Sequence, residues 1–189
     1  DLTPYYLDAL VKYRIKYLWG YSSSLHVLAQ DALQLGRRDI KMTVVITNAE
    51  PLYDYQRKTI SEAFQCPVRE TYGMSELVAA ASECEHGRMH LWPEAGVVEV
   101  LKDDADEPAE PGEAGRLVCT GLVNADMPLV RYEVGDWGVL SPQGEVCLCG
   151  RTLGLIESVD GRCDDILIGA DGKRVGRLDP VFKTAWPLR

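Results

Sequence analysis

Residues 42–51 read MTVVITNAEP, an apolar and β-branched run that ends in a polar loop. Such a continuous run, here 42–47, is typical of a strand covered on both faces, as in parallel sheets. Two more strand candidates lie before and after it, at 17–21 and 68–72. Stretches at 22–35 and 52–64 separate the three strands and have helical periodicity. This alternation predicts an α/β fold with a parallel sheet and flanking helices.

The ends of the first of these helices have recognisable signals. One of Ser22, Ser23 and Ser24 is expected to cap its start, because a serine hydroxyl can accept a hydrogen bond from a first-turn N–H. Gly36 is expected to end it, because glycine readily adopts the left-handed conformation that closes helices.

The pattern changes near residue 90 to short strands separated by glycine and proline. These strands are predicted at 96–101, 115–120, 137–140 and 146–148, and they suggest a meander or a partial β-barrel. Asp171-Gly172 predicts a hairpin that opens a third unit. We therefore expect an α/β nucleotide-binding subdomain at 1–89, a strand-rich subdomain at 90–160, and a hinge with the start of a C-terminal domain at 161–189.

Composition excludes several functions. The net charge is −9, from 29 acidic and 20 basic residues, which argues against a nucleic-acid partner. The sequence holds no apolar run near the roughly 20 residues of a membrane span, and its start lacks signal-peptide features, so we expect a cytoplasmic protein. The chain begins at Asp1 within a helix-like pattern, so we expect a preceding segment in the parent protein.

Two unusual loops follow the second and third strands, where parallel sheets bind their ligands. Ala49 is small enough to let a planar ring approach the backbone, Tyr72 offers an aromatic face, and Glu76 offers an oxygen ligand suited to Mg²⁺. Together they predict an adenine slot with a metal–phosphate end. The alternative is that Glu50 and Glu76 merely open helices, where a carboxylate favours the positive end of the dipole.

Two more motifs follow in order, RYEVGD at 131–136 and GRCDD at 161–165. With these four motifs, the sequence resembles the adenylate-forming superfamily. Within it, the sequence is similar to the phenylacetate-coenzyme A ligase family and its CapK-like relatives in capsular polysaccharide synthesis. The resemblance extends from about residue 18 to residue 183.

The resemblance implies a role for individual residues. It assigns these residues to the nucleotide: Ala49, Glu50, Pro51, Tyr72, Gly73, Met74, Ser75, Asp136, Arg162 and Asp164. Tyr72 would stack on the purine, and Asp136 would accept hydrogen bonds from both ribose hydroxyls. Arg162 would contact the nucleotide from the other side, and Asp164 would be the hinge of the small C-terminal domain. Glu76 would be the catalytic residue that holds Mg²⁺. Alternatively, Asp136 is a turn aspartate, and Arg162 with Asp164 forms a surface ion pair.

The implied activity uses ATP, Mg²⁺ and coenzyme A to activate a small carboxylic acid. The family's glycine-rich phosphate loop and lysine-bearing C-terminal domain have no counterpart in this sequence, so we expect the isolated chain to be inactive. One alternative is a degenerate relative that binds adenine nucleotide without catalysis in polysaccharide or secondary metabolism. Another is a protein that binds no nucleotide and uses zinc for interaction. The oligomeric state stays open, with a homodimer as one alternative.

A second group of residues has the ligand types of a metal site: Cys84, His90, Cys147 and Cys149. Thiolates with one imidazole suit a closed, structural zinc site, and some phenylacetate-ligase relatives carry a similar pattern. Such a zinc would connect the two subdomains. Two pairs of reduced thiols are the alternative, and His86 is a rival to His90.

Some residues near these groups are expected to have ordinary roles. Cys66, Cys119 and Cys163 are expected to be small apolar residues. His26 is expected to face either the core or an acyl pocket.

Overall fold

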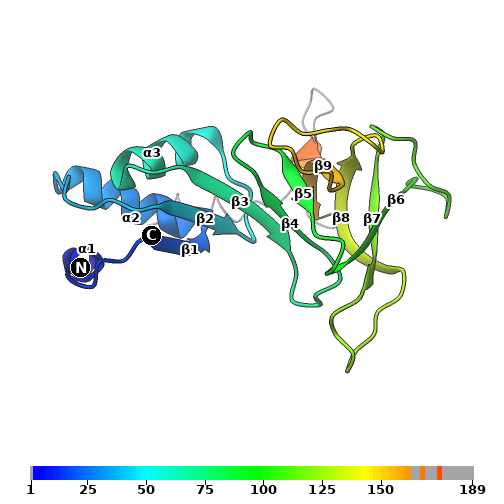
Figure 1. The fold of residues 1–189 in the computed structure, drawn as a ribbon, viewed down its shortest axis with the longest axis horizontal. Coiled ribbons are helices and arrows are strands. Elements are labelled where there is room, and N and C mark those ends of the chain that lie inside the picture. Colours follow the sequence, from blue (N-terminus) through cyan, green and yellow to red (C-terminus); the bar gives the residue numbers. More distant parts are fainter. Residues whose placement is uncertain (1, 163–166, 169–173, 176–189) are drawn as a thin grey trace. The chain divides into compact units, whose positions relative to one another are not determined.

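The computed structural model describes residues 2–162, 167–168 and 174–175 (Figure 1). The chain divides into two compact units, Asp1–Thr71 and Tyr72–Arg189. The composition change near residue 90 therefore lies inside the second unit. No helix in the described part of the chain is long and apolar enough to cross a membrane.

The first unit has the predicted α/β pattern. Its elements in chain order are α1 (Thr3–Lys12), β1 (Tyr17–Tyr21), α2 (Ser22–Gln34), β2 (Val44–Asn48), α3 (Asp54–Phe64) and β3 (Val68–Gly73). Strand β2 pairs in parallel with both β1 and β3. Apolar residues of α2 and α3 form one buried cluster with Val45 of β2 and Val68 of β3. These helices therefore cover one face of a parallel sheet, which confirms the α/β prediction. Buried and half-buried residues alternate along β2, so the expectation that this strand is covered on both faces is wrong for the described residues.

The two ends of α2 differ in how well the sequence predicted them. The N-cap is Tyr21, so the predicted serine cap is wrong, and Ser22 and Ser23 already lie in the helix. At the other end Gly36 has a φ of 66° and donates its N–H to the Leu33 carbonyl at 3.0 Å. The Arg37 N–H reaches the Ala32 carbonyl at 2.9 Å. These bonds form a Schellman motif and confirm that α2 ends at Gly36.

The second unit is an antiparallel sheet. Its strands are β4 (Ala80–Glu83), β5 (Met89–Leu91), β6 (Gly96–Leu101), β7 (Ala114–Gly121), β8 (Tyr132–Leu140) and β9 (Leu155–Arg162). They lie in the order β4-β5-β9-β8-β7-β6, so β6 to β9 form the predicted meander. No pairing among the described residues joins β6 to β4, so the described pairings show no closed barrel. Strands β1 to β9 include both parallel and antiparallel pairs.

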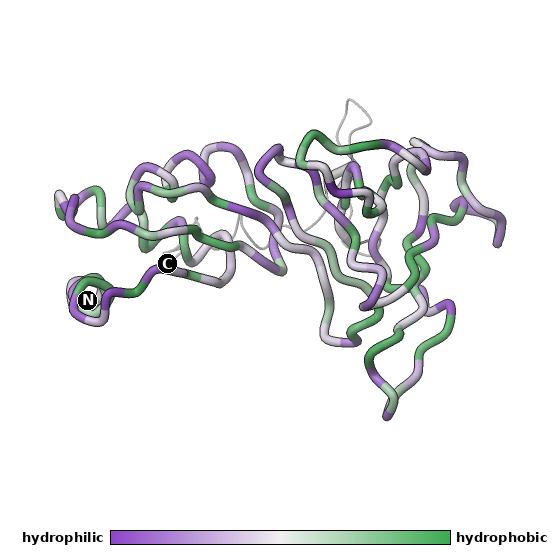
Figure 2. The backbone as a smooth tube through the Cα atoms, in the orientation of Figure 1, coloured by the Kyte–Doolittle hydropathy of each residue, from purple (hydrophilic) through white to green (hydrophobic). Residues whose placement is uncertain are grey.

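Differences from the sequence prediction concentrate in this unit. The strand predicted at 146–148 is wrong, because residues 146–147 have no regular structure and Leu148 lies in a turn that the Gly150 N–H closes on the Cys147 carbonyl at 2.9 Å. The sequence pattern also missed β4, β5 and β9. Beyond β9, β10 (Leu167–Ile168) pairs antiparallel with β11 (Arg174–Val175), as a hairpin requires. The predicted turn at 171–172 lies outside the described residues. Figure 2 shows that the segment between β6 and β7 is hydrophilic, as expected for a solvated loop.

We predict that Gly96→Ala destabilises the second unit. A Cβ atom at Gly96 would lie 2.0 Å from the Val78 carbonyl oxygen and 2.7 Å from that of Thr120, both backbone atoms that cannot rotate away. Overpacking of this kind costs about 1–3 kcal/mol of unfolding free energy, and urea unfolding would measure it. Gly154→Ala is the matched control, because its Cβ would only meet the flexible Leu91 side chain at 3.5 Å. Equal stability of the two variants would contradict this close approach.

Candidate functional site

Two residues that the sequence assigned to one nucleotide contact each other in the second unit. Tyr72 lies near the end of β3, and Asp136 lies in β8, 64 positions further along the chain. The Tyr72 hydroxyl donates a hydrogen bond to Asp136 Oδ2 at 2.9 Å, and both side chains are half-buried. The folded chain thus brings the second and third of the four sequence motifs together at the side-chain level.

A bulge in β8 positions Asp136. Between the register pairs Val118↔Glu133 and Arg116↔Trp137, β8 advances by four residues while β7 advances by two. The additional residues are accommodated where Gly135 has a φ of 80°, a conformation that costs glycine little. Bulges change the direction in which side chains point, and they are frequent beside functional sites. The bulge thus explains why a glycine occupies position 135 of RYEVGD. The interpretation of Asp136 as a turn residue is wrong, because Asp136 lies within a paired strand.

Arg162 lies on the strand next to Asp136. The two residues are direct register partners in the antiparallel pairing of β8 with β9. The third and fourth of the four sequence motifs are therefore neighbours in backbone position. Asp164, the predicted hinge residue, lies outside the described residues.

In the first unit, the loop after β2 holds a buried carboxylate. Glu50 is 8% exposed, and its Oε2 accepts hydrogen bonds from the Ser23 N–H at 3.0 Å and the Ser22 hydroxyl at 3.3 Å. The Ser22 hydroxyl also lies 2.9 Å from the Pro51 carbonyl oxygen. A carboxylate that accepts first-turn N–H groups stabilises a helix start. Glu50 thus acts at the start of α2, and not at the start of the helix that follows it, α3.

The conformation of Ala49 is unusual for a residue with a side chain. Its φ is 61°, in the left-handed region, and the residue is exposed. Such a conformation costs a non-glycine residue roughly 1–2 kcal/mol, so the surrounding loop must hold it. Ala49 and Glu50 belong to the first unit, whereas Tyr72 and Asp136 belong to the second. Their convergence on one nucleotide stays a prediction.

The residues after Tyr72 form a turn. Gly73 ends β3, and a Cβ there would lie 3.5 Å from the Ala79 carbonyl oxygen, an ordinary contact. Met74 packs against the buried cluster of the second unit, and Ser75 is exposed. Glu76 is half-buried in the turn, so the alternative that it opens a helix is wrong. Its role as a magnesium ligand stays a prediction.

The four predicted metal ligands form a compact cluster. The ligand atoms of Cys84, His90, Cys147 and Cys149 all lie within 4.8 Å of one another. The Cys84 and Cys147 sulfurs are 3.7 Å apart, and the Cys149 sulfur is 3.3 Å from His90 Nε2. A tetrahedral zinc with bonds of about 2.3 Å to sulfur separates its ligand atoms by about 3.8 Å. The observed spacing therefore suits one tetrahedral ion.

Burial and charge also suit a metal. Cys84, His90 and Cys147 are 6%, 2% and 4% exposed, whereas Cys149 is half-buried. Burial, followed by the charge of Arg151, lowers the pKa of His90, which favours the neutral imidazole that metals bind. Burial opposes the Cys149 thiolate, but hydrogen bonds from the Arg151 backbone and side chain outweigh it and lower the pKa of Cys149 to about 7.

The Cys147 thiol behaves differently. The Cys149 N–H favours its thiolate, but burial and the neighbouring thiols of Cys149 and Cys84 outweigh this and raise the pKa of Cys147. A metal would have to supply the charge that makes this group a thiolate. The 3.7 Å between Cys84 and Cys147 is far longer than the roughly 2.05 Å of a disulfide.

The remaining histidines and cysteines are not part of this cluster. His86 is exposed and outside the cluster, so the fold selects His90. Cys66 and Cys119 are buried, and burial raises the pKa of both thiols, as expected for small apolar residues. Cys163 lies outside the described residues. His26 is 5% exposed, and its ring meets Tyr55 edge-to-face with centroids 5.3 Å apart.

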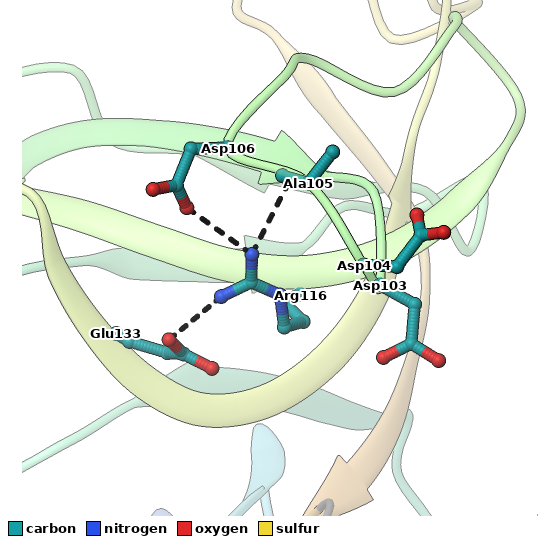
Figure 3. Close-up of a pocket in the computed structure, with 6 residues that line it drawn as sticks. All are labelled: Asp103, Asp104, Ala105, Asp106, Arg116 and Glu133. Atoms are coloured by element: carbon teal, nitrogen blue, oxygen red, sulfur yellow. Dashed lines mark hydrogen bonds and ion pairs between the residues drawn. The ribbon is translucent and has the colours of Figure 1, made fainter.

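A hollow of about 450 Å³ lies between the segment after β6 and strands β7 and β8 (Figure 3). Its lining comprises Asp103, Asp104, Ala105, Asp106, Arg116 and Glu133. Arg116 donates to Glu133 Oε2 at 2.7 Å and to Asp106 Oδ1 at 3.4 Å. Four carboxylates against one guanidinium would repel a phosphate. The hollow contains none of the predicted site residues.

Sequence comparison finds curated proteins that are similar to this chain. No family model matches the chain. Over 134 residues the chain is 34% identical to phenylacetate-coenzyme A ligase of Thermus thermophilus, a match that covers 69% of this chain and 30% of the relative. It is 31% identical over 134 residues to protein CapK of Staphylococcus aureus, covering 70% and 28%. The chain thus spans about a third of the length of the curated relatives it matches.

Solved structures share the fold. A crystal structure of 2-hydroxyisobutyryl-CoA ligase in the postadenylation state, in complex with R3-HIB-AMP, matches with a TM-score of 0.80 and 20% identity, over 97% of this chain and 40% of that one. Apo MatB from Rhodopseudomonas palustris matches with a TM-score of 0.61 and 18% identity, over 92% and 35%. Together with the partial sequence matches, these results confirm the resemblance to adenylate-forming ligases.

We predict that Glu50→Ala destabilises the first unit by about 1–3 kcal/mol, because the Ser22 hydroxyl and the Ser23 N–H lose a buried acceptor. Glu50→Gln retains an acceptor oxygen and should lose less. Glu62→Ala is the control. Glu62 is exposed, and its ion pair with Arg38, at 3.9 Å, contributes little to the free energy of unfolding. Urea unfolding compares the three. A Glu50→Ala protein as stable as Glu62→Ala would contradict the capping role.

Proposed function

We propose that this relative of phenylacetate-coenzyme A ligase carries part of the nucleotide site of an ATP-dependent carboxylate–CoA ligase. The observation that carries the proposal is the 2.9 Å hydrogen bond from the Tyr72 hydroxyl to Asp136. It connects two motifs that are distant in sequence and that the resemblance assigns to one nucleoside. Because the chain covers 30% of its T. thermophilus relative, the complete activity is part of the proposal.

In this proposal the contact organises the nucleoside. The Asp136 carboxylate accepts hydrogen bonds from the two ribose hydroxyls, and charge-assisted bonds of this kind are short and strong. The Tyr72 ring supplies the stacking surface for adenine, while its hydroxyl fixes the ring relative to Asp136. Arg162, opposite Asp136 on β9, contacts the nucleotide from the neighbouring strand. The small side chain of Ala49, whose backbone is in the left-handed conformation, would leave space for the purine edge.

The proposed reaction has two steps. A substrate carboxylate oxygen attacks the α-phosphorus of ATP, forming the acyl-adenylate, and pyrophosphate leaves. The thiol of coenzyme A, as its thiolate, then attacks the acyl carbonyl, and AMP leaves. Mg²⁺, held by Glu76 when bound, would neutralise phosphate charge. The chain's own residues contribute chiefly by orienting the nucleoside, and orientation of the reacting groups is a large part of the catalysis of such transfers. A complex of 2-hydroxyisobutyryl-CoA ligase with 2-HIB-AMP and CoA supports this sequence of steps.

We also propose a structural zinc at Cys84, His90, Cys147 and Cys149. The support is the tetrahedral spacing of the four ligand atoms and the burial of three of the ligands. Four protein ligands leave no open coordination position, so the ion would stabilise the fold and take no part in the chemistry. We expected the zinc to connect two subdomains, but all four residues belong to the second compact unit. It would instead fix the turn between β4 and β5 to the segment after β8.

We predict that Asp136→Ala weakens AMP binding by the chain about 10- to 100-fold, because two hydrogen bonds to a charged acceptor are lost. Isothermal titration of AMP and 2′,3′-dideoxy-AMP measures this, since wild type should prefer AMP and Asp136→Ala should show no preference. Tyr72→Phe retains the ring and should lose less affinity than Tyr72→Ala. Asp126→Ala, in an exposed loop, is the control.

Three results would distinguish the proposed ligase site from its alternatives. Equal binding of both nucleotides by wild type would contradict the role of Asp136. Absence of AMP binding would contradict the nucleotide site. AMP binding by the complete protein without acid-dependent pyrophosphate exchange would support the degenerate, non-catalytic relative.

We predict about one zinc per chain in protein purified without chelators, and a lower unfolding temperature after removal by EDTA. Cys147→Ser and His90→Ala should each reduce the zinc content, because each removes a ligand. Cys66→Ala is the matched control, since Cys66 is buried but lies outside the cluster. Elemental analysis and thermal unfolding are the measurements. Wild-type protein free of zinc, or equal zinc in Cys147→Ser and Cys66→Ala, would contradict the site.

A further inference from the structure

Two ion pairs join the segments that carry the cysteine ligands, and their polarity is crossed. The first segment, 84–88, contributes Glu85 and Arg88; the second, 145–151, contributes Glu145 and Arg151. Arg88 Nη1 lies 2.7 Å from Glu145 Oε1, and Arg151 Nη1 lies 3.2 Å from Glu85 Oε2. Each segment therefore provides one cation and one anion to the other.

Backbone bonds close each segment on itself. In the first, the Cys84 N–H reaches the Arg88 carbonyl at 2.9 Å, and the Gly87 N–H reaches the Cys84 carbonyl at 3.0 Å. In the second, the Gly150 N–H reaches the Cys147 carbonyl at 2.9 Å. These bonds fix each cysteine within its own turn. They do not fix the distance between the turns, which the side-chain pairs span.

The arginines also lie close to the thiols. The Arg151 side chain hydrogen-bonds to Cys149. The hydrogen bond with Glu145 raises the pKa of Arg88, and the charges of Glu145 and Cys147 contribute to the increase. Three thiolates with a neutral imidazole and a divalent ion would leave one net negative charge at the centre. Guanidinium groups on both segments offset that charge, and the carboxylates hold them in place. Groups that orient metal ligands in this way commonly affect metal affinity.

We propose that the crossed pairs Arg88–Glu145 and Arg151–Glu85 hold the two ligand-bearing segments at the spacing that a metal ion needs, and that they slow its release. These four are positioning residues, because they act through the ligands. The inference rests on the proposed zinc site and extends it to a residue set that the sequence motifs did not include.

Exchange of charges across one pair tests the proposal in the 189-residue protein. Arg88–Glu145 is the better choice, because its exposed fractions are 36% and 35%, against 50% and 58% for Arg151–Glu85. The rate of zinc release to an excess of a chromogenic chelator would be measured for wild type, Glu145→Arg and the double variant Arg88→Glu/Glu145→Arg. Glu107→Arg is the matched control, since it makes the same charge change at the exposed Lys102 pair outside the cluster.

We expect Glu145→Arg to release zinc about tenfold faster than wild type or more, while Glu107→Arg releases it at the wild-type rate. The double variant should return to within about threefold of wild type, because the pair is restored with reversed polarity. If Glu145→Arg does not fold, as judged by circular dichroism, Glu145→Gln provides the same comparison without the repulsion.

The outcomes separate this proposal from the zinc site itself. If zinc leaves the Glu145→Arg variant as slowly as it leaves Glu107→Arg, the role of the ion pairs is overturned but zinc binding is not. The same comparison applies to Glu145→Gln if Glu145→Arg does not fold. A double variant as fast as the single one overturns it also. Wild-type protein that holds no zinc overturns the zinc site, and the ion-pair proposal with it.

Discussion

The pairing of β9 with its two neighbours is the constraint on which both candidate sites depend. At one end of β9, Arg162 is the register partner of Asp136 in β8. At the other end, Leu155 is the register partner of His90 in β5. One eight-residue strand thus sets the backbone positions of residues in the nucleotide motifs and of a ligand in the metal cluster. A sheet ladder fixes such positions to within one residue, because a slip by one would turn every side chain to the opposite face.

The two candidate sites use this scaffold differently. The nucleotide motifs depend on a local departure from regular pairing, since the bulge at Gly135 sets the position of Asp136 for its contact with Tyr72. The metal cluster depends on segments that leave the sheet and fold back, with glycines at positive φ in both turns. The regular part of the sheet provides rigidity, and the irregular parts provide the side-chain geometry. Functional groups are commonly positioned by such irregular elements on a rigid scaffold.

The partial sequence matches and the structural likeness are complementary. Matches to phenylacetate-coenzyme A ligase and CapK extend over about 70% of this chain, and the fold likeness extends over more than 90% of it. Below 25% identity the structural match establishes the fold alone. The chemistry that we propose therefore depends on the residues themselves, above all on the contact between Tyr72 and Asp136, and on the spacing of four metal ligands that no periodic pattern explains.

The sequence by itself determined the elements whose signals are local. The alternation of apolar strands and amphipathic helices from 17 to 73, the end of α2 at Gly36, and the metal-ligand types of Cys84, Cys147 and Cys149 could all be read from neighbouring residues. Only the tertiary structure decided the partner of Glu50, the existence of β9, the bulge before Asp136 and the choice of His90 over His86. The physical reason is that these features arise from pairing and burial between segments far apart in the chain, and such contacts leave no periodic signal in the residues on either side.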